Sequence, residues 1–322
     1  MTRIALGIFL SIALTNIGFA QNVESDKSES KTLSILFIGN SYTARHNLAK
    51  VVKSMAEAGN SDLTVEVTSI IYGGRRLVDH WRLGTQNFVR LSTLTADEQE
   101  ATITSLEEAE KEGNRYAKGA LTRHRNLLTT LEEQRTTWDV VVLQSYRDDL
   151  DGEKSLYMKY APKFAELIQA QGGRVILYET TPNTQNAESL TAAPEPEEIL
   201  TKAKSIAALT DQINAKVAPM SLVGLRCQTE RPDFTLRFIN DAHLNHTMAY
   251  LTACSIYAAL FDKSPVGLSV DSITDIRFLN DKERDKDRDG APITRTFGDK
   301  DRADLQRIAW ESYQYFENLR GR

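Results

Sequence analysis

The chain has 322 residues, of which 41% are hydrophobic and 26% are charged, and it carries a formal net charge of −5. This balance excludes a disordered or fibrous chain. It also argues against nucleic acid as the main partner, because neutralising phosphates needs concentrated Lys and Arg. Two cysteines, Cys227 and Cys254, are too few for a disulfide scaffold or a four-cysteine zinc site. They could form one disulfide or remain two buried thiols.

The N-terminus predicts a secretory signal peptide over residues 1–20. Arg3 precedes an apolar run over residues 4–14, and small residues precede the expected cleavage site. An N-terminal membrane anchor is the alternative, but the run is shorter than the roughly 20 residues of a span and Asn16 follows it closely. Residues 21–31 are polar and predict a flexible leader. We therefore expect an exported protein, secreted or periplasmic, without a stable membrane anchor.

Five short apolar runs predict buried strands. Their near-continuous β-branched character is typical of parallel strands that are covered on both faces. Helical patterns over residues 48–58, 157–170, 199–217 and 247–260 lie between or after them, which predicts an open α/β sheet with helices on both sides. The strands are expected at Leu33–Gly39, Leu63–Tyr72, Trp138–Gln144, Arg174–Glu179 and Met220–Leu225.

Two segments are additions to the predicted α/β sheet and its helices. Residues 87–137 hold two charged helical stretches and predict a helical insertion, and residues 266–322 form a C-terminal extension that ends in an amphipathic helix. Although the length suggests roughly two domains of about 150 residues, these additions leave one decorated domain over residues 32–322.

The first predicted strand leads into Gly39-Asn40-Ser41, and sites in open α/β sheets form at the carboxyl ends of strands. The glycine allows a sharp turn into a helix whose first N–H groups would face an anion beside the Ser41 hydroxyl. Asn40 is a candidate for substrate binding. The alternative is that Ser41 or Thr43 only caps the helix.

The second strand is followed by Gly73 and Gly74, whose backbone N–H groups could approach a ligand closely. An ordinary turn is the alternative. Arg75, with Arg76 beside it, could bind an acidic substrate. His80 could belong to the site or could pack inside the fold.

The third strand ends at Gln144, whose side-chain amide could stabilise a developing oxyanion without carrying charge. Tyr146 and Arg147 follow and are candidates for substrate binding. The alternatives are a capped strand end and an arginine that only lies on the surface.

Near the last core helix, Asp241 precedes His243 by two residues. A carboxylate in this position can orient an imidazole and stabilise its charged form. The same residues with His246 permit a metal interpretation, which lacks a third grouped ligand, so we expect no metal and no cofactor.

A separate stretch, Asp285–Gly290, matches the first half of an EF-hand loop. However, Thr296 occupies the position of the bidentate glutamate, and a solvated charged loop is the alternative.

These motifs resemble those of the SGNH/GDSL hydrolases, over about residues 33–265. The resemblance rests on Ile38–Thr43 after the first strand and on residues 240–243, with further similarity at Tyr250–Cys254 and Ser264–Leu268. It implies a flavodoxin-like, three-layer α/β/α domain around a five-stranded parallel sheet. It also implies an esterase or deacetylase.

Carried over to this sequence, the family pattern makes Ser41 the nucleophile and His243 the base. It makes Gly73 or Gly74 an oxyanion donor, with Gln144 as the nearest amide where the family has asparagine. The family acid stands three residues before the histidine, where this chain has Asn240, so we expect Asp241 to take that role.

The resemblance and the predicted export together favour a serine esterase that removes O-acetyl groups from carbohydrates. Small-molecule or carbohydrate esters are the expected partners. The residues expected to bind them are Asn40, Arg75, His80, Tyr146 and Arg147. The alternative is a carbohydrate-binding or structural protein with the same fold and a degenerate site, which the departures at Asn240 and Gln144 favour.

Overall fold

The computed structural model describes residues 31–150, 154–180, 195–239, 241 and 243–320. The predicted signal peptide lies outside the described residues, and so does the predicted leader apart from Lys31, the first residue of β1. Among the described helices, none is long and apolar enough to cross a membrane.

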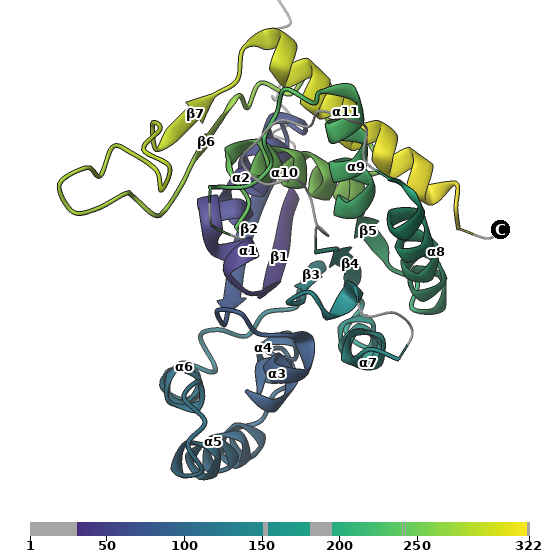
Figure 1. Cartoon of the computed structure of the whole chain (residues 1–322). Coiled ribbons are helices and arrows are strands. Elements are labelled where there is room, and N and C mark those ends of the chain that lie inside the picture. Colours follow the sequence, from purple (N-terminus) through teal and green to yellow (C-terminus); the bar gives the residue numbers. More distant parts are fainter. Residues whose placement is uncertain (1–30, 151–153, 181–194, 240, 242, 321–322) are drawn as a thin grey trace, which may run out of the picture.

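A five-stranded parallel sheet in the order β2-β1-β3-β4-β5 forms the centre of the molecule (Figure 1). This confirms the predicted α/β class and the predicted sheet. The strands are β1 (Lys31–Gly39), β2 (Leu63–Ile71), β3 (Val140–Gln144), β4 (Arg174–Tyr178) and β5 (Lys216–Ala218).

The fifth strand was predicted at Met220–Leu225, and this prediction is wrong. That apolar run belongs to α9 (Met220–Glu230), while β5 comes just before it at Lys216–Ala218. Pro219 separates the two elements at the N-terminal boundary of the helix. The run is buried on most sides, and a buried helix and a buried strand give the same short apolar pattern.

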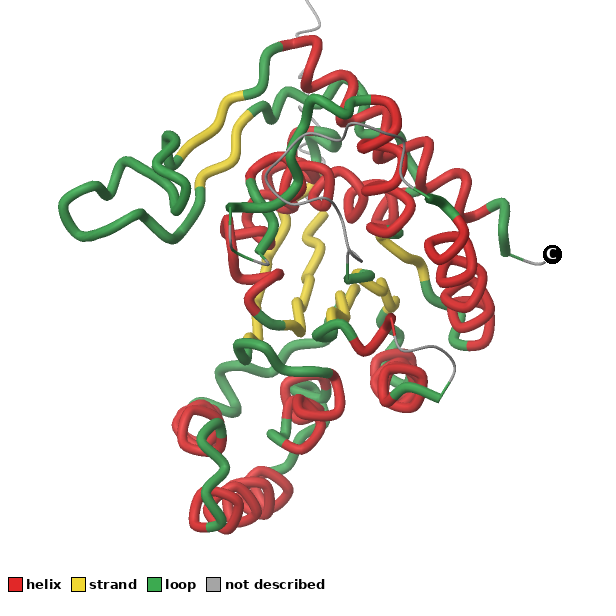
Figure 2. Tube along the Cα trace, in the orientation of Figure 1, coloured by secondary structure: helices red, strands yellow, loops and turns green. Residues whose placement is uncertain are grey.

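Helices cover both faces of the sheet (Figure 2). Besides α9, they are α1 (Ser41–Ala44), η1 (Arg45–Asn47), α2 (Leu48–Ala58), α3 (Leu77–Arg82), α4 (Thr85–Val89), α5 (Ala96–Lys111), α6 (Ala117–Thr129), η2 (Asp148–Leu150), α7 (Leu156–Gln169), α8 (Glu197–Gln212), α10 (His246–Phe261) and α11 (Asp299–Glu317).

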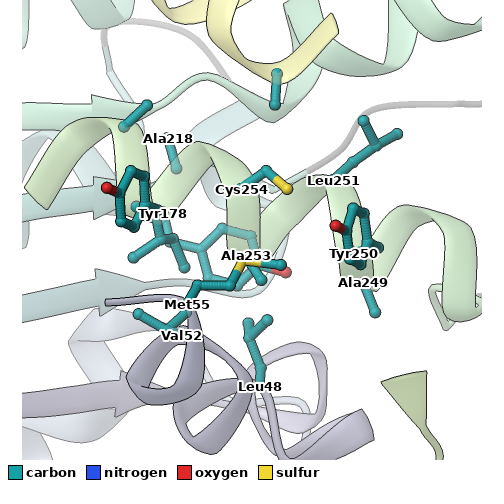
Figure 3. Packing of buried hydrophobic residues seen from close by; sticks show 14 of the residues in the cluster. Leu48, Val52, Met55, Tyr178, Ala218, Ala249, Tyr250, Leu251, Ala253 and Cys254 are labelled. Atoms are coloured by element: carbon teal, nitrogen blue, oxygen red, sulfur yellow. The ribbon is translucent and has the colours of Figure 1, made fainter. Parts of the chain in front are cut away.

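Side chains on the central strands alternate between two cores, as the two-residue period of a strand requires. Ile35 and Phe37 of β1 face the core that α2 and α10 complete, whereas Leu36 and Ile38 face the core on the side of α7. Figure 3 shows part of the first core, where Met55 of α2, Tyr178 of β4 and Cys254 of α10 lie together. Helix α10 is buried along nearly its whole length, which accounts for its uniformly apolar sequence.

Two additions extend the sheet domain. Helices α5 and α6 pack against each other within the predicted insertion. In the C-terminal extension, β6 (Ser272–Thr274) and β7 (Thr294–Thr296) form an antiparallel pair joined by a long loop, and α11 packs on α9 and α10. We call residues 272–296 the arm; Figure 1 shows it projecting from the side of the sheet domain.

Both cysteines are buried free thiols, so the disulfide alternative does not apply to this structure. Burial raises the pKa of Cys227 to about 12 and that of Cys254 still further. Neither thiol is therefore suited to act as a nucleophile near neutral pH.

Candidate active site

The turn from β1 into α1 carries Ser41 as the first helical residue. Asn40 caps the helix, because its side-chain oxygen accepts a hydrogen bond from the Tyr42 backbone N–H at 3.0 Å. Gly39 is required at this turn, since a Cβ there would lie 2.4 Å from Thr43 Oγ1 and 2.8 Å from Gln144 Oε1. Asn40 is fully buried, whereas Ser41 is partly exposed, so the turn presents the serine rather than the asparagine.

Gln144 lies beneath this turn and is fully buried. Its side-chain oxygen accepts hydrogen bonds from the Asn40 backbone N–H at 2.9 Å and from Thr43 Oγ1 at 3.1 Å. Because a backbone N–H can only donate, the oxygen must face Asn40, and the amide nitrogen therefore donates to the Ser145 carbonyl. The Gln144 amide therefore supports the turn and is bonded within the protein, and the oxyanion role expected for it stays a prediction.

The turn after β2 lies beside the same helix N-terminus. Asn40 Nδ2 donates to the Arg75 carbonyl at 3.1 Å, which brings the Gly73-Gly74-Arg75 segment next to Ser41. Gly74 has a φ of +64°, a conformation that favours glycine, and no atom lies within 4 Å of a Cβ built at Gly73 or Gly74. There is therefore open space at the Cα positions of Gly73 and Gly74.

Asp241 and His243 form a direct side-chain pair. Asp241 Oδ1 lies 2.5 Å from His243 Nδ1 and also accepts from the His243 backbone N–H at 3.0 Å. Although Asp241 stands two residues before the histidine, the loop brings its carboxylate onto the imidazole. The bond fixes the tautomer, because Nδ1 holds the proton for Asp241 and Nε2 is left able to accept one.

The Tyr42 ring connects His243 to the first turn of α1. The ring centroids of Tyr42 and His243 are 5.8 Å apart in an edge-to-face arrangement, and Tyr42 directly follows Ser41. Tyr42 also stacks on Tyr146, which is 37% exposed. Tyr42 therefore links the first turn of α1, where Ser41 lies, to the Asp241–His243 pair.

Cationic groups gather around this site. Arg288 Nη1 lies 3.0 Å from Asp241 Oδ2, and Arg45 Nη1 lies 3.8 Å from the same oxygen. Burial alone would raise the pKa of Asp241, but the hydrogen bonds with His243 and the charges of His243 and Arg288 outweigh it and lower that pKa. The carboxylate is therefore held in its charged form.

Arg147 and Arg237 act electrostatically on Tyr42. Burial raises the pKa of the Tyr42 phenol, while the charges of Arg237 and Arg147 partly oppose that rise. Arg147 has a φ of +63°, which is uncommon for a residue with a side chain. Arg147 directly follows Tyr146 and supplies positive charge near Tyr42.

His80 has the structure of a packed residue. It is fully buried, with Nε2 2.9 Å from the Gly39 carbonyl oxygen and Nδ1 3.1 Å from Thr85 Oγ1. Burial lowers its pKa to about 4, so it is neutral near pH 7. This placement supports the packing alternative, and the expectation that His80 contacts substrate stays a prediction.

Arg75 lies over the Tyr116 ring at 4.1 Å from the ring centroid, and Arg76 lies 3.6 Å from Asp79. These contacts hold both guanidinium groups against neighbouring side chains of the protein.

From the sequence, His246 was considered only as a metal ligand and His46 was given no role, but both connect the segment around His243 to neighbouring elements. His46 Nε2 donates to the Leu244 carbonyl at 2.8 Å, and His246 Nε2 donates to the Ile293 carbonyl of the arm at 2.9 Å. Burial lowers the pKa of His46 to about 4. The two buried imidazoles therefore connect this part of the chain to η1 and to the arm.

Arg45 and Asp275 form a second connection between η1 and the arm. Arg45 Nε donates to Asp275 Oδ1 at 2.9 Å, and Arg45 Nη2 contacts Asp275 Oδ2. Arg45 is only 2% exposed. No sequence periodicity relates an arginine after the first strand to an aspartate in the C-terminal extension, which is why this pair was missed.

In the candidate calcium loop, the Asp287 carboxylate accepts hydrogen bonds from the backbone of the same loop. Asp287 Oδ1 accepts from the backbone N–H groups of Asp289 and Ala291 at 2.9 and 3.0 Å, and Asp287 Oδ2 lies 3.6 Å from His246 Nδ1. Across the part of the chain that the structure describes, no group of three or more His, Cys, Asp or Glu residues is placed to hold a metal ion.

No protein-family model matches the chain, and no curated protein sequence matches it. Among solved structures, the chain is similar to a candidate SGNH hydrolase from Slackia heliotrinireducens, with 18% identity, a TM-score of 0.46 and coverage of 71% of this chain and 100% of that one. It is also similar to a DUF4886 family protein from Bacteroides uniformis, with 12% identity, a TM-score of 0.48 and coverage of 88% and 96%.

A third similar structure is a gut microbial diltiazem-metabolizing enzyme, with 11% identity and a TM-score of 0.35. The match covers 72% of this chain and 47% of that one. These distant similarities leave the site of this chain to be interpreted from its own residues.

Proposed function

We propose that the protein is an exported serine esterase, with Ser41 as nucleophile, His243 as general base and Asp241 as the carboxylate that orients it. One observation carries the proposal: the 2.5 Å contact between Asp241 Oδ1 and His243 Nδ1, beside the helix turn that begins with Ser41. A nucleophile, a base and an orienting carboxylate are the three groups that acyl transfer to serine requires.

In this mechanism, His243 Nε2 takes the Ser41 proton while Oγ attacks the ester carbonyl. The backbone N–H groups of Ser41 and of Gly73 or Gly74 stabilise the resulting oxyanion. His243 then protonates the leaving alkoxide, and a water molecule hydrolyses the acyl-enzyme by the same steps. Asp241 remains ionised throughout, since its pKa is lowered by its bonds to His243.

The substrate class that we favour is an O-acetylated carbohydrate, including acidic sugars. Tyr146 offers an exposed aromatic ring next to Tyr42, and a tyrosine side chain combines an apolar ring with a polar hydroxyl group. Arg147 adds a cation that can bind a carboxylate or sulfate. An ester of a small molecule would meet the same nucleophile and the same base.

Hydrolysis of p-nitrophenyl acetate by the purified mature chain tests the proposal. We expect Ser41→Ala to remove the turnover of wild type while the circular dichroism spectrum is retained. The matched control is Ser61→Ala, because Ser61 is an exposed serine in the turn before β2 whose hydroxyl hydrogen-bonds to Asp62. Turnover that persists at the wild-type rate in Ser41→Ala contradicts the proposal.

The competing function is a carbohydrate-binding or structural protein without catalysis. The placement of Gln144 favours it, because the amide is committed to the Ser145 carbonyl and only backbone donors remain for an oxyanion. Losing one such donor costs about 10²–10³ in rate rather than all activity. A wild-type protein that binds acetylated oligosaccharides in calorimetry but hydrolyses no ester would support this alternative.

A further inference from the structure

The arm reaches back onto the loop that carries the candidate base. Asp241 uses one carboxylate oxygen for His243 and presents the other to Arg288, whose Nη1 is 3.0 Å away. Arg288 comes from the loop between β6 and β7, far from His243 in the sequence. The carboxylate is therefore shared between an imidazole and a guanidinium group.

The neighbouring residue of the arm fixes the start of the same loop. Both carboxylate oxygens of Asp289 lie 3.0 Å from the Ile239 backbone nitrogen and accept its hydrogen. Consecutive residues of the arm thus contact the loop at two points, one at its backbone and one at its functional carboxylate. A contact made only for packing would not need to select the one carboxylate that bonds His243.

We propose that Arg288 is a positioning residue that holds Asp241 in place and weakens its attraction for the His243 proton, so that the base is neutral at the pH where the enzyme works. The catalytic meaning of this role rests on the proposed function. The coupling of Arg288, Asp241 and His243 is a physical property of the loop that can be measured without activity.

The direction of the coupling follows from Coulomb's law. A positive charge on the far side of Asp241 reduces the negative potential at His243 and disfavours the imidazolium. The other groups that face this pair are Arg45 from η1, 3.8 Å from Asp241 Oδ2, and Tyr42 from α1, in ring contact with His243.

Further charges lie one step away from the pair. Asp287 and Asp289 lie on the arm beside Arg288, and Arg147 and Arg237 act on Tyr42. None of them is changed when Arg288 alone is replaced. Replacing Arg288 therefore removes one cation while the other charges stay in place, and His243 should then hold its proton more strongly.

The experiment is a pH titration of the His243 imidazole by NMR in the full mature chain, assigned as the signal that is lost in His243→Asn. We expect the titration midpoint in Arg288→Gln to rise by about 0.5–1 pH unit. Arg288→Lys keeps the charge and should stay close to wild type, whereas Asp241→Asn should lower the midpoint. The matched control is Arg284→Gln, because Arg284 lies on the same arm and contacts Asp281 and Phe278 instead.

A midpoint that stays the same or falls in Arg288→Gln overturns the proposal, as does an equal rise in Arg288→Lys or Arg284→Gln. The acidic limb of kcat/KM for ester hydrolysis should move to higher pH together with the midpoint. If wild type hydrolyses no ester, the proposed function fails while the titration still decides the role of Arg288. If wild type is active and the titration does not move, only the role of Arg288 fails.

Discussion

Removing the charge of Asp275 should destabilise the whole protein, because it leaves Arg45 buried without its main partner. Arg45 is 2% exposed and makes two contacts to the Asp275 carboxylate, through Nε at 2.9 Å and through Nη2. The next carboxylate, Asp241, is 3.8 Å from Arg45 Nη1. Breaking a buried ion pair on one side costs about 3–5 kcal/mol, and we expect this loss for Asp275→Asn.

Urea unfolding at pH 7, followed by circular dichroism, measures this loss as a change in the free energy of unfolding. Asp281→Asn is the control, since Asp281 pairs with Arg284 on the same arm but its side chain is 85% exposed; its cost should stay below about 1 kcal/mol. Adding Arg45→Met to Asp275→Asn should recover most of the stability, because the double variant no longer buries an unpaired charge. A cost below about 1 kcal/mol for Asp275→Asn would refute this reasoning.

Two further predictions concern the turn that presents Ser41. Gly39→Ala should lower the free energy of unfolding in urea by about 1–3 kcal/mol, because the new Cβ would lie 2.4 Å from Thr43 Oγ1. The control is Gly119→Ala, where a Cβ meets no atom within 4 Å, and it should not lower the free energy of unfolding. Equal losses in the two variants would contradict this expectation. His80 has a pKa of about 4 in the folded protein against 6.5 in the unfolded chain, so wild-type stability falls as the pH drops below 6.5. At pH 4.5 this effect lowers the free energy of unfolding of wild type by about 2–3 kcal/mol, and His80→Gln lacks it. The difference in free energy of unfolding between wild type and His80→Gln should therefore become smaller from pH 7 to pH 4.5. A difference that stays constant would contradict the low pKa of His80.

The sheet could be predicted from the sequence because its central strands have no polar face. The fully buried VVVLQ run of β3 is rich in β-branched valines, which favours a strand that is covered on both sides over a buried helix. The same reasoning failed at Met220–Leu225, since α9 is also buried and only Pro219 marks where the strand ends and the helix begins. An apolar run of this length indicates that the segment is buried, but it is too uniform to show whether the residues repeat with the period of a strand or of a helix.

The candidate site was predictable where neighbouring residues define it. Asp241 and His243 lie close in sequence, and the structure pairs their side chains as expected. The orientation of the Gln144 side chain could not be predicted, because it depends on the Asn40 backbone N–H and on the space that Gly39 leaves, neither of which a strand pattern contains.

The arm was beyond prediction for a related reason. Arg288 contacts Asp241 through tertiary folding alone, and in the sequence it is one charge within a charged stretch. Such stretches are usually solvated loops. Arg284 lies in the same loop between β6 and β7, and only the contact of Arg288 with Asp241 distinguishes the two arginines.

Covalent labelling is the sharpest test of whether Ser41 is an activated nucleophile. A fluorophosphonate should react with the folded wild-type chain, and peptide mapping by mass spectrometry should find a single adduct on Ser41. The adduct should disappear in Ser41→Ala and form much more slowly in His243→Asn, because the serine then lacks its base. An unlabelled wild-type chain, or an adduct on a different residue, would contradict the account.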